Sequence, residues 1–188
     1  QEQVNGAYQR ILDALREIPG VQEAALVDRL PRDGGSASAK ASIEGRDPAQ
    51  IPLHVELFKR SASVNYLRMM GVPLKAGRYL EESDRGLKRT VINESAALQY
   101  FDGMNPIGQR IGLEWKGAKE PPNVFEIVGV VANLPFAERD AVTPPAMYVG
   151  FEQMFWPISS FVVRTDGDPL ALAGAIRAKV ASLDRSRA

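Results

Sequence analysis

Side chains that could take part in chemistry are few and scattered in this 188-residue sequence. His54 is the only histidine and there is no cysteine, so neither a histidine cluster nor a thiolate site can hold a metal ion. A serine hydrolase would have to pair His54 with Ser36 or Ser38, and no G-x-S-x-G segment supplies the nucleophile. We therefore expect His54 to be a structural side chain within a strand.

A second group of candidates is acidic. Glu81, Glu82 and Asp84 are close enough in sequence to suggest a general acid and base, or a calcium loop. Because they lack the alternating aspartates and the distal glutamate of a calcium loop, we expect a solvated acidic turn. The charged residues Lys116, Lys119 and Glu120 similarly indicate that the 116–123 segment is an exposed hairpin tip. The sequence predicts no catalytic, cofactor-binding or metal-ligating residues and no enzyme activity.

Composition narrows the possible partners. The 23 basic and 23 acidic residues balance to zero formal charge, which argues against nucleic acid as a ligand. No Walker lysine or dinucleotide-binding glycine motif is present, so we do not expect ATP hydrolysis in this segment. No apolar run approaches the ~20 residues that cross a bilayer, and the first residues lack a signal pattern. We expect a globular stretch without a membrane span.

The two ends of the chain predict similar elements. Residues 7–18 place five apolar side chains on one face of a helix, and a β-rich segment follows at 21–30. Near the other end, a strand at 161–164 precedes Asp168, which can cap a helix that starts at Pro169. Leu172, Ile176 and Val180 then recur at four-residue spacing. Each end thus predicts an amphipathic helix that covers a sheet.

Strands dominate the region between. We predict them at 39–44, 53–64, 90–92, 109–115, 124–134 and 146–151, with loops at 31–38, 116–123 and 135–145. Asn65 is expected to cap a very short helix that ends at Gly71, followed by an extended segment at 72–74. Asn93 is expected to cap a helix reaching Phe101, which we prefer to the alternative of an N-x-S glycosylation acceptor. For the aromatic corner at 155–157, we prefer core or linker packing to an exposed binding patch. The fold class is α+β.

Seven segments, in order, resemble the periplasmic core domain of MacB-type ABC transporter permeases. They lie at residues 64–78 (VNYLRMMGVPLKAGR), 82–84, 91–101, 105–111 (NPIGQRI), 127–131, 144–153 and 162–172. The order of these segments carries the resemblance, which spans nearly the whole chain. Gly150 is a small departure, because the family often has proline there.

The resemblance implies a fold and a domain division. Family members have a porter-like α/β subdomain interrupted by a strand-rich, sabre-like subdomain. On this sequence the division places residues 1–85 and 155–188 in the first and residues 86–154 in the second. Both termini are then expected at one end of the molecule.

The resemblance also implies a non-catalytic role in export. The segment would be the periplasmic domain of an inner-membrane permease that couples ATP-driven motion to efflux of antibiotics, peptides or lipoproteins. Implied partners are a periplasmic adaptor (membrane fusion) protein, an outer-membrane channel, a second permease subunit and a separate or fused ATPase domain; no cofactor is implied.

The sequence is also compatible with two other functions. A free-standing periplasmic binding protein would use Trp156 and neighbouring aromatic residues in a cleft for a peptide or small ligand. A hydrolase would depend on His54 with Ser36 or Ser38, and the absence of a nucleophile elbow makes it remote.

Overall fold

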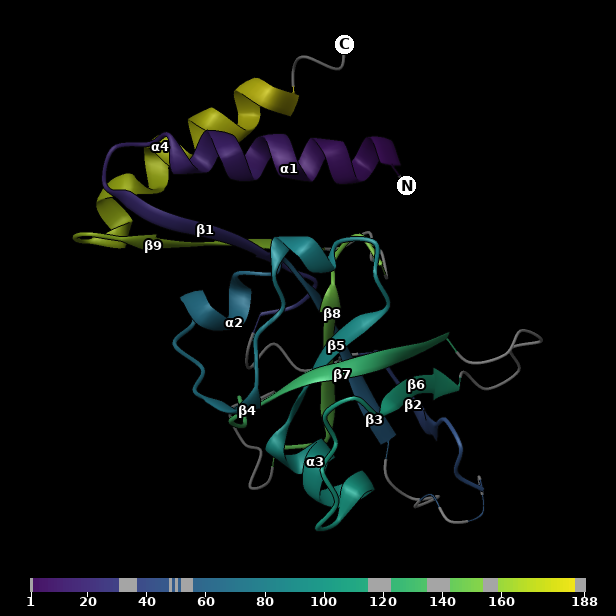
Figure 1. Ribbon diagram of the computed structural model, residues 1–188. Helices are drawn as coiled ribbons and strands as arrows, with labels where there is room; N and C mark the ends of the chain where they lie inside the picture. Colours follow the sequence, from purple (N-terminus) through teal and green to yellow (C-terminus); the bar gives the residue numbers. More distant parts are fainter. Residues whose placement is uncertain are drawn as a thin grey trace.

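The computed structural model describes residues 2–30, 37–47, 49, 51, 56–114, 123–134, 143–153 and 159–184 (Figure 1). Its helices are α1 (Glu2–Arg16), α2 (Tyr66–Met69), α3 (Glu94–Phe101) and α4 (Pro169–Asp184), with a 3₁₀ turn at Glu82–Asp84. Its strands are β1 (Val21–Val27), β2 (Ala37–Ile43), β3 (Glu56–Ala62), β4 (Leu74–Gly77), β5 (Arg89–Asn93), β6 (Arg110–Glu114), β7 (Asn123–Val131), β8 (Ala146–Gly150) and β9 (Ser160–Thr165). The mixture of helices and strands confirms the predicted α+β class.

Six of the strands close into a barrel. The hydrogen-bonded order is β2-β6-β7-β5-β8-β3, and β2 also pairs with β3, which joins the two ends of this path. The β3/β8 and β5/β7 pairs are parallel, while β2/β3, β2/β6, β6/β7 and β5/β8 are antiparallel. Because closure leaves no free edge among these strands, the barrel is the most extensively hydrogen-bonded part of the fold.

Alternate side chains of the barrel strands fill its interior. Ile92, Ile111 and Ile127, for example, are completely buried there. The short helix α3 lies across one end of the barrel and adds Ala96, Tyr100 and Phe101 to the same apolar cluster. The alternation arises because successive side chains of a strand point to opposite faces. The barrel core is therefore closed at the α3 end by a helix.

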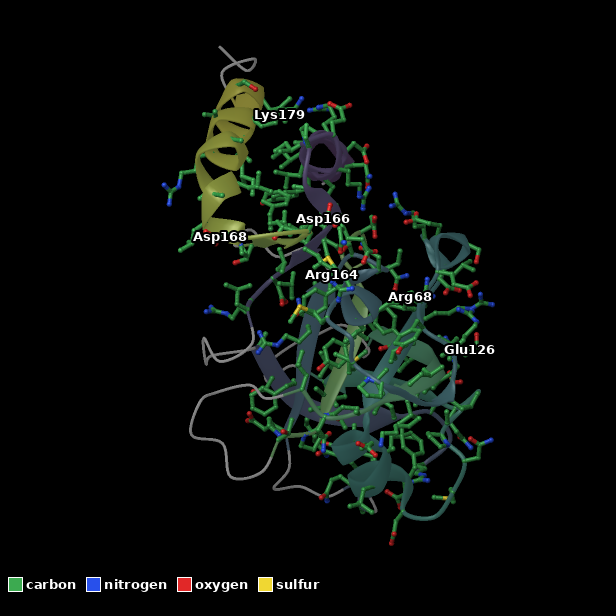
Figure 2. The ribbon with its side chains drawn as sticks, turned by 90° about the vertical axis from the view of Figure 1, so that its left-hand side faces the viewer. Arg68, Glu126, Arg164, Asp166, Asp168 and Lys179 are labelled. Carbon is green, nitrogen blue, oxygen red and sulfur yellow. The ribbon has the colours of Figure 1, made fainter. Side chains whose placement is uncertain are left out.

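Two strands continue the sheet beyond the barrel and carry a layer of helices. β1 pairs with β3 only at Val27↔Ala62, and β9 pairs with β1 over six positions. Helices α1 and α4 pack on one face of this β1–β9 ribbon (Figure 1). Lys179 reaches from α4 toward α1 (Figure 2), where its ammonium group lies 3.0 Å from the Glu17 carboxylate. We call α1, β1, β9 and α4 the helical layer.

The outer start of α1 and the outer end of α4 lie at the same end of the molecule, and α3 lies at the opposite end (Figure 1). This agrees with the expected placement of the two termini. Among the described residues, none of the helices has the length and hydrophobicity needed to cross a lipid bilayer.

The short strand β4 packs closely against β7 on the outside of the barrel. β4 lies against β7, and Gly77 adopts φ 67°, a conformation that favours glycine. A Cβ atom on Gly129 would lie 1.9 Å from the Arg78 carbonyl oxygen, which is far inside contact distance. Only glycine at position 129 lets the β4 backbone pass this closely.

The predicted elements are confirmed in kind, with shifted ends. The first helix covers Glu2–Arg16 instead of 7–18, and the strand predicted at 53–64 ends at Ala62, while its predicted start at 53 lies outside the described residues. The extended segment predicted at 72–74 lies later, as β4 (Leu74–Gly77). Within β3, Glu56 is exposed and Phe58 is half-buried, whereas Arg60 is only 4% exposed, so this side of the strand becomes buried toward its C-terminal end.

The three predicted helix caps differ in outcome. Asn93 Oδ1 accepts a hydrogen bond from Ala96 N at 2.9 Å, and Asp168 Oδ1 accepts one from Leu170 N at 2.9 Å, which confirms both caps. The Asn65 cap is wrong as predicted. Its side chain makes no hydrogen bond to α2; instead its amide nitrogen donates to the Ala24 carbonyl of β1. The Asn65 Oδ1 atom, which a cap would use, instead accepts a hydrogen bond from the Ser63 hydroxyl at 2.8 Å.

Candidate functional site

Two of the candidates for catalysis, His54 and Ser36, lie outside the described residues, as do Trp156 and the charged 116–120 segment. Ser38 lies in β2, where its hydroxyl donates a hydrogen bond to the Glu56 carboxylate. Among the described residues, no group of three or more histidine, aspartate and glutamate side chains could hold a metal ion. The remaining candidates, Glu81, Glu82 and Asp84, lie in or beside the 3₁₀ turn.

The predicted acidic turn is the centre of a set of interactions, and the prediction that it is solvated is wrong for Asp84. Only 1% of the Asp84 side chain is exposed. Its carboxylate receives two hydrogen bonds from Arg78, at 2.6 and 2.9 Å, and one from Arg89 at 2.7 Å. The backbone N–H of Glu81 donates a fourth at 2.9 Å. Asp84 thus holds residues 78–89 in one conformation; we call this segment the junction loop.

These hydrogen bonds keep the Asp84 carboxylate ionised. Arg78 contributes most, followed by Arg89 and the Glu81 amide, and together they hold the pKa of Asp84 well below its ordinary value despite its burial. The same pairing raises the pKa of both arginines. A carboxylate held this firmly in its charged form cannot act as a proton acceptor near neutral pH. Its chemistry is structural.

The junction loop connects the barrel to the helical layer through Arg85. The Arg85 guanidinium donates to Gln9 Oε1 of α1 at 3.2 Å and lies 3.6 Å from the Glu152 carboxylate, just beyond β8. Beside it, the Phe151 ring meets the Tyr8 ring of α1 edge to face, with 5.1 Å between ring centroids. These contacts join α1 to the junction loop and to the residues just after β8.

A buried ion pair forms a second connection, where β1 meets β3. Lys59 Nζ lies 3.4 Å from Asp28 Oδ2, and the two side chains are 3% and 6% exposed. Asp28 Oδ2 also accepts a hydrogen bond from Ser61 N at 3.0 Å, while Asp28 N donates to the Ser61 carbonyl at 2.8 Å. The pair joins the helical layer to the barrel wall in a place that excludes water.

Burial dominates the electrostatics around this pair. It lowers the pKa of Lys59, and the attraction of Asp28 opposes that change. Burial also lowers the pKa of the neighbouring Arg60 and raises the pKa of Tyr66 to about 12. Burial likewise raises the pKa of Tyr148 above its ordinary value.

Sequence reasoning did not identify either connection. Lys59 follows Leu57 on one side of β3, so strict alternation places it on an interior face, a signal that could have been followed. Arg85 and Asp28 carry no comparable signal, because their partners are 76 and 31 residues away in the chain.

Exposed apolar side chains mark the far end of the molecule. Leu98 on α3 is 72% exposed and Met104, just after it, is 51% exposed. They border a shallow depression of about 570 Å³ that Ser95 and Asn133 also line. This end lies opposite the outer ends of α1 and α4 (Figure 1).

Comparisons with known proteins agree with this architecture. A family model described as the MacB-like periplasmic core domain matches residues 3–179. The periplasmic region of MacB from Actinobacillus actinomycetemcomitans is similar, with 18% identity, a TM-score of 0.64, and coverage of 93% of this chain and 73% of that chain. The extracellular domain of the noncanonic ABC-type transporter YknZ from Gram-positive bacteria has 16% identity, a TM-score of 0.59, and coverage of 93% and 80%. At these identities the structural likeness shows the fold. No curated protein sequence matches the chain.

Proposed function

Since the chain belongs to the family of MacB-like periplasmic core domains, we propose that it carries ATP-driven motion of an ABC permease to a partner outside the cytoplasm. The chemistry of ATP hydrolysis belongs to a separate or fused ATPase domain. In this role the domain couples movement to export of cargo such as antibiotics, peptides or lipoproteins and catalyses no reaction itself.

One observation carries the proposal: the outer ends of α1 and α4 lie together at one end of the molecule, and α3, which carries the exposed Leu98 and precedes the exposed Met104, lies at the other (Figure 1). Membrane helices that continue from both helices would move the helical layer as a unit. The Arg85 contacts and the Lys59–Asp28 pair would then transmit this displacement to the barrel. The result is a shift between two arrangements with different affinity for a partner.

The exposed end is our candidate for the partner surface. Leu98 and Met104 would meet a periplasmic adaptor protein, with a second permease subunit beside this one and an outer-membrane channel beyond the adaptor. Exposed large apolar residues that lie close together commonly mark protein interfaces. This placement puts the partner as far as the fold allows from the membrane.

The division into subdomains remains a proposal as well. Residues 1–85 with 155–188 supply the whole helical layer, in keeping with a porter-like part. Residues 86–154 supply β5, β6, β7, β8 and α3, in keeping with an inserted strand-rich part. The two parts share one continuous sheet, because β2 and β3 pair with β6 and β8.

The transport role is tested by exchanging Arg85 for alanine in the parent permease. We expect export of cargo to fall at least severalfold while ATPase activity is retained, because the contact between α1 and the junction loop is lost. Arg110→Ala is a matched control: its side chain is 42% exposed against 39% for Arg85, and it forms a similar surface ion pair, with Glu44. Equal export by both variants would contradict the coupling role.

The partner surface is tested separately by adaptor binding. Leu98→Asp with Met104→Asp should weaken capture of the adaptor by the purified domain, because a charge replaces apolar contact area. Leu170→Asp, at an 81% exposed position on α4, serves as the control. If only the control weakens capture, the proposed partner surface is wrong, and the adaptor binds at the helical layer.

The topology of the parent protein distinguishes the alternative function. A permease requires an apolar span of about 20 residues before this segment and further spans after it. A reading frame with only a cleavable signal and this segment would instead indicate a free-standing periplasmic protein that binds a peptide or small ligand.

A further inference from the structure

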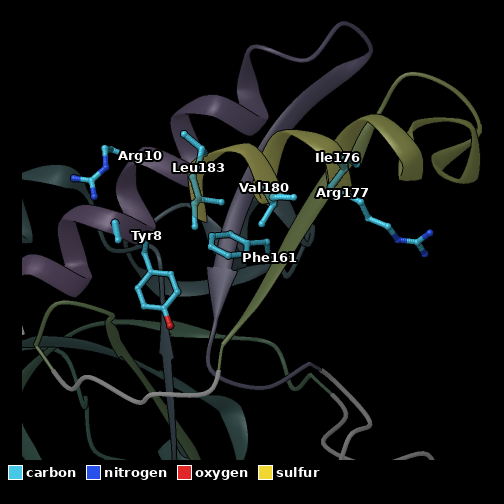
Figure 3. A pocket seen from close by; sticks show the side chains of 10 residues that line it. Tyr8, Arg10, Phe161, Ile176, Arg177, Val180 and Leu183 are labelled. Carbon is cyan, nitrogen blue, oxygen red and sulfur yellow. The ribbon is translucent and has the colours of Figure 1, made fainter. Parts of the chain in front are cut away.

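Helices α1 and α4 diverge above β9 and leave an open apolar groove between them (Figure 3). Its volume is about 600 Å³, within the range typical of small-molecule sites. The apolar lining comes from three elements: Tyr8 and Ile11 of α1, Phe161 of β9, and Ile176, Val180 and Leu183 of α4. We call this feature the interhelical groove.

The groove is an uncovered part of a core. Directly beneath it, Leu12, Leu15 and Leu26 are buried almost completely. The apolar side chains that line the groove belong to the same cluster or border it but are only partly buried. Leaving such area in water costs free energy, so a ligand that covers it gains from burial.

The charges at the groove have one sign. Arg10 lies on one side and Arg177 on the other, both exposed, with their guanidinium groups directed outward (Figure 3). Among the side chains that the structure describes, no acidic one lines the groove. Within the described residues neither arginine forms an ion pair, whereas Arg16 pairs with Asp13 and Lys179 with Glu17 on the same two helices. The groove therefore offers two unneutralised cations beside an apolar surface.

We propose that the interhelical groove binds a single-chain amphiphile with an anionic head group, such as a carboxylate or a phosphate monoester. The alkyl chain lies against Ile11, Phe161 and Val180, and the head group lies at the rim, within reach of an arginine. Guanidinium groups match the geometry of both anions with two parallel hydrogen bonds. This site is separate from the junction loop and does not depend on the transport role.

The lining favours an alkyl chain over a polar ligand or an extended peptide. Apart from the Tyr8 hydroxyl and the two arginines, the side chains that line it are apolar. A peptide in extended form would bury backbone N–H and C=O groups here without partners, which is unfavourable. An alkyl chain has no such groups.

Isothermal titration of the 188-residue protein tests the site, with three probes that share a twelve-carbon chain and are kept below micelle formation. We expect dodecanoate or dodecyl phosphate to bind at least tenfold more tightly than dodecyltrimethylammonium. The stronger of the two anions identifies the head group as carboxylate or phosphate, and either result supports the site. Equal binding of the cationic and anionic probes would overturn the proposal.

Variants locate the binding. Arg10→Gln with Arg177→Gln should weaken binding of the anions at least tenfold; the single variants show which end holds the head group. Both positions are exposed, so folding should be unaffected. Arg68→Gln removes the same charge from α2, whose side chains pack in a different apolar cluster from α1, and should have no effect.

Ala7→Trp, which fills the groove, should abolish binding while the circular dichroism spectrum is kept. If this variant does not fold, NMR replaces it. Dodecanoate should then shift the methyl signal of Ala181 in the unsubstituted protein but not in the arginine double variant. Unchanged binding in the arginine variant, or a dimer of the chain that occupies the groove and excludes dodecanoate, would contradict the proposal.

Discussion

At the scale of single residues, Asp84 shows how an acidic cluster can be structural. Its carboxylate accepts four hydrogen bonds from Arg78, Arg89 and the Glu81 amide, so its full bonding capacity is used. Nothing remains to bind a metal or move a proton. The neighbouring Glu82, whose side chain is 68% exposed, makes only a surface ion pair with Arg85.

We predict that Asp84→Asn lowers the free energy of unfolding by about 2 kcal/mol at pH 7, since charge-assisted hydrogen bonds are worth about 1.5–3 kcal/mol each and the half-exposed arginines regain water. Urea unfolding measures the change. Glu82→Gln should differ from the unsubstituted protein by no more than about 0.5 kcal/mol, and an equal loss in both variants would contradict the prediction.

The same residue predicts a dependence on pH. The pKa of Asp84 is lower in the folded protein than its ordinary value near 4, so its stabilisation is complete above about pH 5 and is lost as pH falls. Urea unfolding between pH 7 and pH 3 should show a steeper loss for the unsubstituted protein than for Asp84→Asn. Parallel curves would show that other carboxylates dominate acid unfolding.

The buried pair predicts strong coupling between two residues. Lys59→Met should lower the free energy of unfolding by about 3 kcal/mol, because it leaves the Asp28 carboxylate buried without its cation. Adding Asp28→Asn should recover more than about 1 kcal/mol, since the buried carboxylate that lost its cation is then neutral. A double-mutant cycle from thermal or urea unfolding measures this coupling, and additive effects would contradict it.

At the scale of elements, close backbone contact determines what a strand can tolerate. Gly129 of β7 lies under the Arg78 carbonyl, whereas Gly174 of α4 has open space around its Cβ position. The same substitution should therefore have opposite effects in the two elements.

We predict that Gly129→Ala lowers the free energy of unfolding by at least about 2 kcal/mol, because backbone must move to admit the methyl group. Gly174→Ala should instead raise it by about 0.5–1 kcal/mol through better helix propensity. Denaturant unfolding of both variants is the measurement. Similar losses at the two sites would mean that the β4–β7 contact is looser than the structure has it.

At the scale of the whole molecule, the barrel and the helical layer differ in how they are held. Each of the six barrel strands pairs with a neighbour on both sides, whereas β9 pairs in the described structure only with β1, and α4 lines one side of an open groove. The contacts of Arg85 and the Lys59–Asp28 pair are among those that join the parts.

Hydrogen exchange should follow this division. We expect the amides of β5, β7 and β8 to exchange most slowly, because their opening requires disruption of the closed barrel, and those of α4 to exchange much faster. Exchange measured by mass spectrometry or NMR on the 188-residue protein checks the order. Protection of α4 equal to that of β7 would indicate one cooperative unit.

Much of the fold follows from local patterns in the sequence. Apolar periodicity predicts α1, α4 and the long strand β7, because side-chain direction repeats every 3.6 residues in a helix and every two in a strand. Asn93 and Asp168 identify the starts of α3 and α4, since a cap needs only backbone groups two or three residues away. The ordered motifs at 64–78 and 91–111 indicate the family, which the family model confirms.

Only the tertiary structure decides what depends on partners far apart in the chain. Closure of the barrel rests on the β2/β3 and β2/β6 pairings, and no local pattern specifies which strands meet. Asp84 becomes buried because the folded loop brings Arg78 and Arg89 around it, and Asn65 is drawn from its helix by the Ala24 carbonyl 41 residues away. The interhelical groove exists only where two terminal helices, each amphipathic by itself, diverge over β9. Local sequence thus determines the elements, whereas burial, pairing and the open surface are set by long-range packing.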